Sequence, residues 1–369
     1  MIVGILKEIP PETRVSLLPE TVSQLIKKGI EVIVESSAGV LASASDSDYS
    51  NAGAQIANAS EVISKSDILL TIQHGAVQNI PGSKVLIGVF QPLYHPDLVN
   101  DFVEKKLTVF SLDMLPRTSR AQIMDVLSSQ ANIAGYKAVL LAAYSYPRYF
   151  PMFMTAAGSI PPAKVLILGA GVAGLQAIAT ARRLGAVVEV FDTRAAVKEE
   201  VMSLGAKFVE VEGAADATKA GGYAVEQTED YKQKQQQRIA ESIAKADIVI
   251  TTAQIPGKKA PVLITEEMIN KMRKGSVIID IAAATGGNTP FTKNNETINK
   301  NGVAIIGNGN LPGTMPFDAS KLYGKNIYNF LQLIIDKENK LNLNWDDDLV
   351  KGSCVTFDGK IMNDRLKAI

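Results

Sequence analysis

The chain has 369 residues, 46% of them hydrophobic, with 38 basic and 38 acidic residues. This length and composition predict two domains with sizeable cores, and the balanced charge gives no sign of a nucleic-acid or membrane-surface partner. The single cysteine, Cys354, excludes a disulfide framework, and two isolated histidines, His74 and His95, are too few for a zinc cluster, so we expect no metal site. No apolar run is long enough to span a membrane.

The first 125 or so residues alternate between short apolar strands and helices. The expected strands are Ile2–Leu6, Glu31–Glu35, Ile68–Thr71, Lys84–Val89 and Leu107–Ser111. The expected helices are Thr21–Lys28, Asp46–Ala54 and Pro96–Lys105. This alternation predicts an open, mostly parallel sheet with helices on both faces. Because this half has no G-x-G-x-x-G sequence, we expect a doubly wound domain without a nucleotide of its own.

A long helical pattern rich in Ala and Leu follows from Ser119 to Tyr144. It lies between two α/β regions, so we expect it to connect two domains. The prolines at 147 and 151 end it, because proline cannot continue a helix.

The most informative segment is Ala163–Gln176, in which four apolar residues run into Gly169, Gly171 and Gly174. Another apolar run, Val187–Phe191, ends at Asp192, 23 residues after the first glycine. This pattern predicts a strand, a tight turn and a helix whose N-terminus faces a pyrophosphate, with an acid that binds the ribose. The alternative is a βαβ turn that binds nothing, which is disfavoured because strand, helix and acid all agree.

Asp192 also bears on the choice of dinucleotide. A carboxylate accepts hydrogen bonds from ribose hydroxyls and repels a 2′-phosphate, so NAD(H) is favoured over NADP(H). Arg194 is the opposing signal, because it could pair with a 2′-phosphate; alternatively it packs over the adenine or faces solvent.

Further strands are expected at 207–210, 248–251, 277–280 and 303–306, which nearly completes a six-stranded Rossmann sheet. The intervening stretch Val211–Gln237 is charged, rich in Gly and Gln, and carries Tyr223 beside Gly222. We expect a mobile loop there that closes over the cofactor, although disorder is the alternative. The residues predicted to bind the cofactor are Gly169, Gly171, Val172, Gly174, Asp192, Thr193, Arg194, Gly222 and Gln254.

A last helix is expected from Ala319 to about Ile335, capped by Asp318. A helix that returns after a complete Rossmann sheet would pack on the first domain. The prediction is therefore an α/β fold of two doubly wound Rossmann-like domains joined by long helices. The first domain is discontinuous (1–130 plus 318–369), and the second, 131–317, binds NAD(H).

Lys7-Glu8, Arg14–Leu17, the segment Pro116–Gln130 and the Rossmann core together resemble two related families over essentially the whole length. These are alanine dehydrogenase and the NAD(H)-binding component of the proton-translocating nicotinamide nucleotide transhydrogenase. The resemblance implies that Arg117, Gln122, Asp125 and Ser128 contact the nicotinamide end, with Tyr223 of the loop as a further candidate.

Spacing gives independent support. If a helix begins near Ser119, then Gln122, Asp125 and Ser128 recur every three residues and lie roughly on one face. The alternative is a solvated helix face on which Asp125 pairs with Arg117.

Alanine dehydrogenase is the rival interpretation, and its acid–base side chains are missing here. It resembles this chain at Arg14, but it needs a lysine near Thr71 or Gln73, a histidine near Gln91 and an aspartate near Ala284. Direct hydride transfer between two nicotinamides needs no such groups. The departures therefore favour the transhydrogenase, and a non-catalytic NAD-binding regulator is the third possibility.

The resemblance also implies partners and location. NADP(H) would be bound on a partner domain, and a membrane proton-channel subunit would couple hydride transfer to proton translocation. The chain would be a homodimer without nucleic-acid partners, cytoplasmic, and held at the inner face of the cell membrane through its partner subunits.

Overall fold

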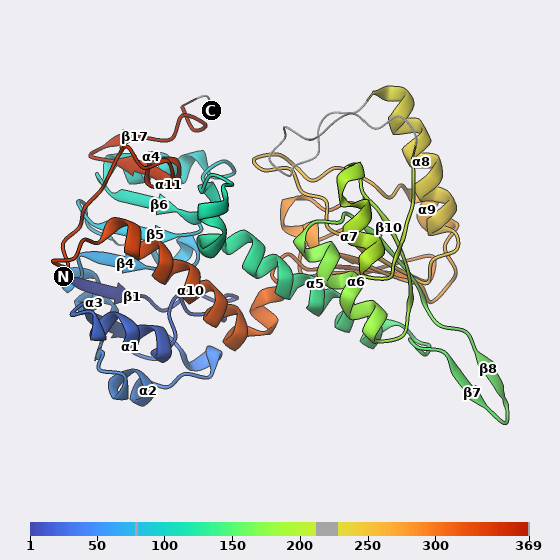
Figure 1. Ribbon diagram of the computed structural model, residues 1–369, viewed down its shortest axis with the longest axis horizontal. Coiled ribbons are helices and arrows are strands. Elements are labelled where there is room, and N and C mark those ends of the chain that lie inside the picture. The colour runs from blue at the N-terminus through green and yellow to red at the C-terminus, as the bar shows by residue number, and fades with distance from the viewer. Residues whose placement is uncertain (78–79, 212–227, 368–369) are drawn as a thin grey trace. The chain divides into compact units, whose positions relative to one another are not determined.

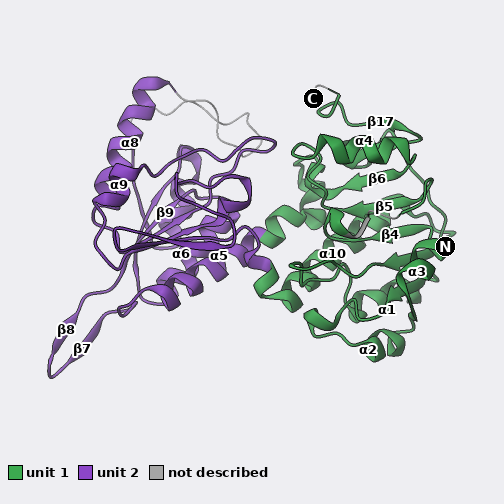
Figure 2. Cartoon of the chain, turned by 180° about the vertical axis from the view of Figure 1, so that it is seen from behind, with its two compact units in different colours: residues 1–130, 313–369 green, residues 131–312 purple. Residues whose placement is uncertain are grey.

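The computed structural model describes residues 1–77, 80–211 and 228–367. The chain divides into two compact units, shown in Figure 2: unit 1 comprises residues 1–130 and 313–369, and unit 2 comprises residues 131–312. Each unit is built on its own large sheet.

The sheet of unit 1 has the strand order β17-β16-β6-β5-β4-β1-β2-β3. The run from β6 to β3 is parallel, whereas β16 pairs antiparallel with both β6 and β17. Its strands are β1 (Ile2–Ile5), β2 (Glu31–Glu35), β3 (Gln55–Ala57), β4 (Ile68–Leu70), β5 (Val85–Gly88), β6 (Thr108–Ser111), β16 (Cys354–Phe357) and β17 (Lys360–Ile361). Its helices are α1 (Pro19–Lys27), α2 (Asp46–Asn51), α3 (Ala59–Lys65), α4 (Pro96–Glu104), α10 (Pro316–Ile334) and α11 (Asp348–Ser353), with 3-10 turns that include η2 (His74–Val77) and η4 (Ser119–Met124).

Both faces of this sheet are covered. Along β4, Ile68 and Leu70 belong to one hydrophobic cluster and Leu69 belongs to another. Successive side chains of a strand point to opposite faces, so strands that are apolar throughout are buried on both sides. Helix α10 contributes Tyr323 and Phe330 to the first cluster (Figure 1), and the C-terminal segment thereby completes unit 1.

The sheet of unit 2 has the order β11-β10-β9-β12-β13-β15-β14, parallel except for the edge strand β14. Its strands are β9 (Lys164–Leu168), β10 (Val187–Phe191), β11 (Lys207–Phe208), β12 (Ile248–Thr251), β13 (Val277–Asp280), β14 (Glu296–Lys300) and β15 (Val303–Gly307). Its helices are α6 (Val172–Arg183), α7 (Lys198–Ser203), α8 (Glu229–Ile243) and α9 (Glu266–Asn270), and a separate hairpin joins β7 (Phe153–Thr155) to β8 (Gly158–Ile160). Two clusters again cover opposite faces. The predicted fold class, two doubly wound α/β domains with a discontinuous first one, is confirmed.

The chain passes between the units twice. The first passage lies within helix α5 (Val126–Ser145), and the second lies at residues 312 and 313, just before α10, rather than at 318. Asp318 does not cap α10: the helix begins at Pro316 after Met315, and Asp318 lies in its first turn. Proline is favoured at the first helical position, and an acid in the first turn interacts favourably with the helix dipole.

The continuous helix expected from Ser119 is wrong. Residues Ser119–Met124 form the 3-10 turn η4, Asp125 has non-helical backbone angles (φ −74°, ψ 89°), and α5 begins only at Val126. The Asp125 carboxylate accepts the Ser128 backbone N–H at 2.9 Å, as a residue preceding a helix does when it caps the first turn. A side chain that binds its own backbone in this way competes with helix continuation.

The loop expected over Val211–Gln237 is wrong at its C-terminal end, because Glu229–Ile243 forms helix α8. Thr228 caps this helix, accepting the Tyr231 N–H, and Tyr231 and Ile239 are buried on one side. The rest of that loop, with Gly222 and Tyr223, lies outside the described residues. No helix in the described ranges is long and apolar enough to cross a lipid bilayer.

Candidate functional site

The glycine-rich turn joins β9 to α6 at the carboxyl edge of the sheet in unit 2. Gly169 has a φ of +108°, a conformation that favours glycine, and its N–H donates to Phe191 at the end of β10. Gly171 is the N-cap of α6, and no side chain caps that helix end. The backbone N–H groups of the first turn are therefore left for another acceptor.

The three glycines serve different purposes. A Cβ on Gly174 would lie 1.9 Å from the Gly169 carbonyl oxygen, and one on Gly169 would lie 2.3 Å from the Thr252 hydroxyl oxygen, so close packing requires both glycines. A Cβ on Gly171 would meet no atom within 4 Å. Gly171 thus faces open space at the N-terminus of α6, where an anionic group can approach the backbone.

Asp192 follows β10 and is only 9% exposed. Its Oδ2 accepts the backbone N–H of Ala170, inside the glycine turn, at 2.7 Å, and its Oδ1 accepts the Arg194 N–H at 2.8 Å. The predicted ribose-binding acid therefore lies directly against the turn.

Arg194 pairs with this same carboxylate. Its Nε donates to Oδ1 at 2.9 Å and its Nη2 to Oδ2 at 2.8 Å. This side-chain hydrogen bond raises the pKa of Arg194 above its usual range. The expectation that Arg194 faces solvent is not what the structure shows: the guanidinium forms a two-pronged charge pair with Asp192.

The remaining candidates of unit 2 lie around this turn. Val172 is the first residue of α6 and is exposed, Thr193 is half-buried between Asp192 and Arg194, and Gln254 is exposed on the segment after β12. Thr252 binds this segment to the turn, since its N–H donates to Leu168 at 3.0 Å. Turn, acid and the segment 252–254 thus share the carboxyl edge of three neighbouring strands.

The other predicted group lies in unit 1, on η4 and the start of α5. Asp125 and Ser128 contact each other, with the Ser128 hydroxyl donating to Asp125 Oδ2 at 2.6 Å. Gln122 and Arg117 are exposed, on η4 and on the segment before it. Since η4 is not α-helical, the predicted common face for Gln122, Asp125 and Ser128 is wrong in its geometry; their role as nucleotide contacts stays a prediction.

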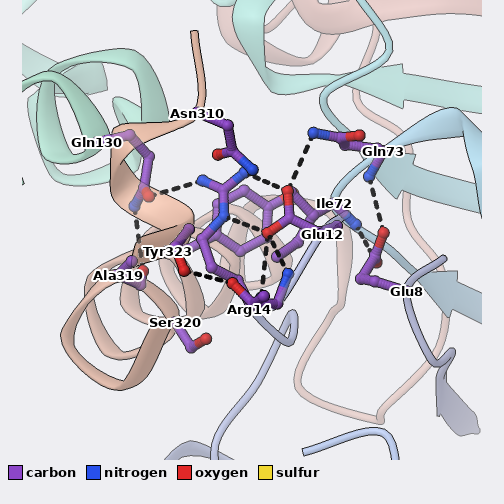
Figure 3. A network of polar contacts seen from close by, with 12 residues as sticks. Glu8, Glu12, Arg14, Ile72, Gln73, Gln130, Asn310, Ala319, Ser320 and Tyr323 are labelled. Atoms are coloured by element: carbon purple, nitrogen blue, oxygen red, sulfur yellow. Dashed lines mark hydrogen bonds and ion pairs between the residues drawn. The ribbon is translucent and has the colours of Figure 1, made fainter. Parts of the chain in front are cut away.

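Unit 1 also contains a buried polar cluster that the sequence pattern does not reveal, apart from Arg14. Figure 3 shows Glu12 and Arg14 in a two-pronged ion pair, with Arg14 Nε at 2.8 Å from Oε1 and Nη2 at 2.6 Å from Oε2 of Glu12. Arg14 Nη1 donates to Gln130 at 2.7 Å, and the Gln73 amide donates to Glu12 at 3.0 Å. These groups occupy the carboxyl ends of β1 and β4.

Glu8 lies beside them and accepts three hydrogen bonds: from the Thr71 hydroxyl (2.7 Å), the Ile72 N–H (2.6 Å) and the Gln73 N–H (3.2 Å). Burial nevertheless raises its pKa to about 7, and the nearby Glu12 charge acts in the same direction. For Glu12 burial also works to raise the pKa, but the hydrogen bonds and charge of Arg14 bring it below its usual value.

The positions at which an alanine dehydrogenase needs acid–base groups have other uses here. Thr71 is fully buried and its hydroxyl is bound to Glu8, and Gln73 is bound to Glu12. Gln91 lies in a turn with a φ of +49°, and Ala284 lies in the 3-10 turn η6 (Ile281–Thr285).

The two histidines are not isolated from each other, contrary to expectation. His74 follows β4 and His95 precedes α4, and their ring centroids are 5.1 Å apart. Burial, and then the neighbouring His95, lower the pKa of His74. Within the described ranges, no group of three or more His, Cys, Asp or Glu residues is arranged to hold a metal ion.

Taken together, the two doubly wound units and the glycine turn with its acid define an α/β protein of the dinucleotide-binding class. Residues 4–134 match the alanine dehydrogenase/PNT N-terminal domain and residues 138–364 the corresponding C-terminal domain. The chain belongs to the alanine dehydrogenase/PNT family.

Within this family the chain is similar to the first of the polypeptides that make up NAD(P) transhydrogenase subunit alpha of Rhodospirillum rubrum, at 48% identity over 97% of this chain and 96% of that one. A solved structure of a transhydrogenase from Sinorhizobium meliloti superimposes with a TM-score of 0.89 at 43% identity, covering 98% of this chain and 100% of the other. An alanine dehydrogenase of Staphylococcus saprophyticus is 29% identical over 86% of this chain and 82% of its own. The predicted resemblance to both branches, stronger for the transhydrogenase, is confirmed.

Proposed function

We propose that this chain is the NAD(H)-binding component of a proton-translocating NAD(P) transhydrogenase. Hydride passes directly between NAD(H) on this chain and NADP(H) on a partner domain, and a membrane subunit couples that transfer to proton movement. The single observation that carries the proposal is the turn of unit 2, where the open Gly171 and the uncapped start of α6 lie beside Asp192.

The turn can bind a pyrophosphate through backbone N–H groups and the positive end of the α6 dipole. Asp192, held against the same turn, is positioned to accept hydrogen bonds from the adenosine ribose. The adenosine half of NAD(H) would therefore be bound entirely by unit 2.

The choice of NAD(H) follows from the Asp192–Arg194 pair. Arg194 is directed at the carboxylate by two side-chain hydrogen bonds, so its charge is largely compensated. A 2′-phosphate would have to break that pair and also approach Asp192, which costs more than any single new contact returns. A ribose diol needs neither change.

Direct hydride transfer also agrees with the side chains of unit 1. Thr71, Gln73, Gln91 and Ala284 offer no group that exchanges protons near neutral pH. An oxidative deaminase would need such groups, whereas hydride transfer between two nicotinamides needs only their alignment. We assign that alignment to Gln122, Asp125, Arg117 and Ser128. Asp125 and Ser128 fix each other at the start of α5, and exposed Gln122 reaches the ring.

The partner assignment includes a second copy of this chain. Figure 1 shows hairpin β7–β8 extending from the body of unit 2, and it carries Met152, Phe153 and Met154, the last 76% exposed. Exposed apolar residues gathered on one projection are typical of an interface. We propose that they pack on a second copy, so M154D should yield monomers in sedimentation velocity. The location at the inner face of the cell membrane, through partner subunits, is part of the same proposal.

The test is reconstitution with an NADP(H)-binding domain and rapid-mixing measurement of hydride transfer from NADH. Gln122→Asn shortens the side chain by one methylene, and a displacement of about 1 Å can slow transfer roughly a hundredfold. NADH affinity should change little, because Gly169–Gly174 and Asp192 are intact. The matched control is Gln55→Asn, at another exposed glutamine of unit 1.

Two results would contradict the proposal. If the parent chain oxidises NADH only with pyruvate and ammonia, and never with the partner domain, it is an alanine dehydrogenase-like enzyme. If it binds NADH but transfers hydride in neither assay, it is a non-catalytic binding protein.

A further inference from the structure

A fully buried asparagine, Asn288, connects the segments that follow β12 and β13 in unit 2. Its Nδ2 donates to the carbonyl oxygens of Ala253 (2.9 Å) and Pro261 (2.7 Å), and its Oδ1 accepts the Ala253 N–H at 3.2 Å. An asparagine amide has two N–H groups and one carbonyl. All of them are used, and all three hydrogen bonds go to backbone atoms of the segment 253–261.

Asn288 is itself held by Asp280, at the end of β13. The Asp280 Oδ2 accepts the Asn288 N–H at 2.6 Å and the Thr292 hydroxyl at 2.6 Å. Gly287 makes this approach possible: its φ is +76°, and a Cβ there would lie 2.8 Å from Asp280 Oδ2. The amide of Asn288 therefore has one orientation, set from both ends.

The segment that Asn288 holds is the one that touches the glycine turn. Ala253 lies between Thr252 and Gln254, and the Thr252 hydroxyl is 3.3 Å from the carbonyl oxygens of Leu168 and Gly169. A continuous series of contacts thus runs from Asp280 through Asn288 and Ala253 to Gly169. It crosses the carboxyl ends of β13, β12 and β9, which are neighbours in the sheet.

We propose that Asn288 is a positioning residue for the bound dinucleotide: it fixes the backbone of residues 252–254 as the wall of the cofactor crevice. In a doubly wound sheet the ligand binds outside the carboxyl ends of the strands at this place. The inference rests on the proposed function, because it concerns how NAD(H) is held for hydride transfer. Asn288 itself contacts backbone rather than cofactor.

The structure predicts what its removal does. Asn288→Ala leaves the Ala253 N–H and two carbonyl oxygens without partners, so the segment 252–254 loosens. Gly169–Gly174 and Asp192 keep their own contacts and hold the adenosine half. NADH affinity should therefore fall less than threefold, while hydride transfer at saturating NADH falls at least tenfold, because alignment is lost.

The matched control is Asp247→Ala. Asp247 is also buried, accepts the Lys164 N–H at 3.0 Å and pairs with Arg273 at 3.6 Å, but it lies at the amino edge of the same sheet. Both variants lose buried polar contacts of unit 2, and only one of them loses contacts beside the crevice. Each is assayed with the NADP(H)-binding domain well below its own unfolding temperature.

Hydrogen exchange of the parent and Asn288→Ala chains without partner provides a readout independent of activity. Ala253 should lose protection in the variant while β12 keeps it. If Asn288→Ala does not fold, Asn288→Ser, which retains one short polar group, takes its place in both measurements.

Slower hydride transfer in the Asn288 variant alone, with local loss of protection, supports the inference. Equal rates in parent and Asn288 variant, or equal losses in the Asn288 and Asp247 variants, overturn it. A parent chain that transfers no hydride at all would instead refute the proposed function, so the two failures are distinguishable.

Discussion

The two units repeat one strand order around their first strands and differ in the segments that come directly after those strands. In unit 1 the order is β3-β2-β1-β4-β5-β6, and in unit 2 it is β11-β10-β9-β12-β13-β15. After β9 the chain has the turn Gly169–Gly171, open to solvent at Gly171. After β1 it has Glu8, Glu12 and Arg14, all buried and bound to one another or to backbone.

The difference teaches that a doubly wound sheet supplies a crevice, and that the first turn decides whether an anion can enter it. In unit 2 the turn presents backbone N–H groups with no side chain in the way. In unit 1 the N–H groups of Ile72 and Gln73, after β4, are already bound by Glu8. A pyrophosphate there would also meet the charge of Glu12, so one fold gives one nucleotide-binding unit and one closed unit.

The largest expected effect separates folding of the open turn from its use. Gly171→Ala should leave the unfolding temperature unchanged, because a Cβ there meets nothing within 4 Å. It should weaken NADH binding by at least about a hundredfold, because the Cβ occupies the space that a pyrophosphate needs and several charge-assisted hydrogen bonds are lost together. Titration of NADH fluorescence, with calorimetry of the empty chain, measures both.

Gly174→Ala is the companion variant. Its Cβ would lie 1.9 Å from the Gly169 carbonyl oxygen, so the turn must open and stability must fall as well. Full NADH affinity in Gly171→Ala would mean that the pyrophosphate does not approach this glycine, and the comparison of the two units would lose its basis.

Asp192→Asn should weaken NADH binding ten- to hundredfold. A hydrogen bond to a charged group contributes roughly 1.5–3 kcal/mol, and the amide presents one acceptor instead of two. The comparison of units then gains a second element, since Asp192 binds the glycine turn of unit 2 whereas Glu8 closes the crevice of unit 1. Arg194→Ala is the matched variant: NADPH should bind more weakly than to the parent, because Asp192 is left without its partner. An unchanged NADH affinity in Asp192→Asn would remove this acid from the ribose site.

Much of this comparison can be predicted from the sequence, because local patterns determine it. The strands of both sheets are short β-branched runs, and the glycine spacing with Asp192 indicates the turn directly. Helix α8 escapes such prediction because most of its residues are polar and only Tyr231, Ile239 and Ile243 are buried. The edge strands β14, β16 and β17 escape it because they are short or half-exposed and carry little apolar pattern.

The candidate site divides in the same way. Asp192 can be found from spacing, but its bond to Arg194 depends on side-chain conformations. Helical spacing places Asp125 on a helix face, and this is wrong because its capping bond to Ser128 overrides the helical period. Asn288 carries no signal at all, since its role depends on Ala253, 35 residues earlier in the chain, being brought beside it.

A third prediction concerns the closed crevice of unit 1. The pKa of Glu8 is raised to about 7 in the folded chain, above the ordinary value of 4.5 that the unfolded chain has. The folded state therefore binds this proton more tightly, and the stability that it contributes is present at low pH and is lost as pH rises toward 7. Between pH 5.5 and 7.5 the free energy of unfolding should fall by about 2 kcal/mol through this group.

Urea denaturation of the parent and of Glu8→Gln at these two pH values measures the effect. The variant cannot titrate at this position, so its dependence on pH should be flatter by that amount. Parallel pH dependences in parent and variant would show that Glu8 is ionised in the folded chain throughout this range.

The smallest expected effect lies at the same edge of unit 1, where the two histidines of the chain meet. Burial, and then the neighbouring His95, lower the pKa of His74. The rings are 5.1 Å apart, so a charge on one disfavours a charge on the other. His95→Ala should therefore raise the titration midpoint of His74 toward its ordinary value while leaving NADH binding by unit 2 unchanged. With two histidines in the chain, NMR of the imidazole protons assigns both without ambiguity. A His74 midpoint that does not move would leave burial as its sole cause, and a change in NADH affinity would mean that the closed unit influences the open one.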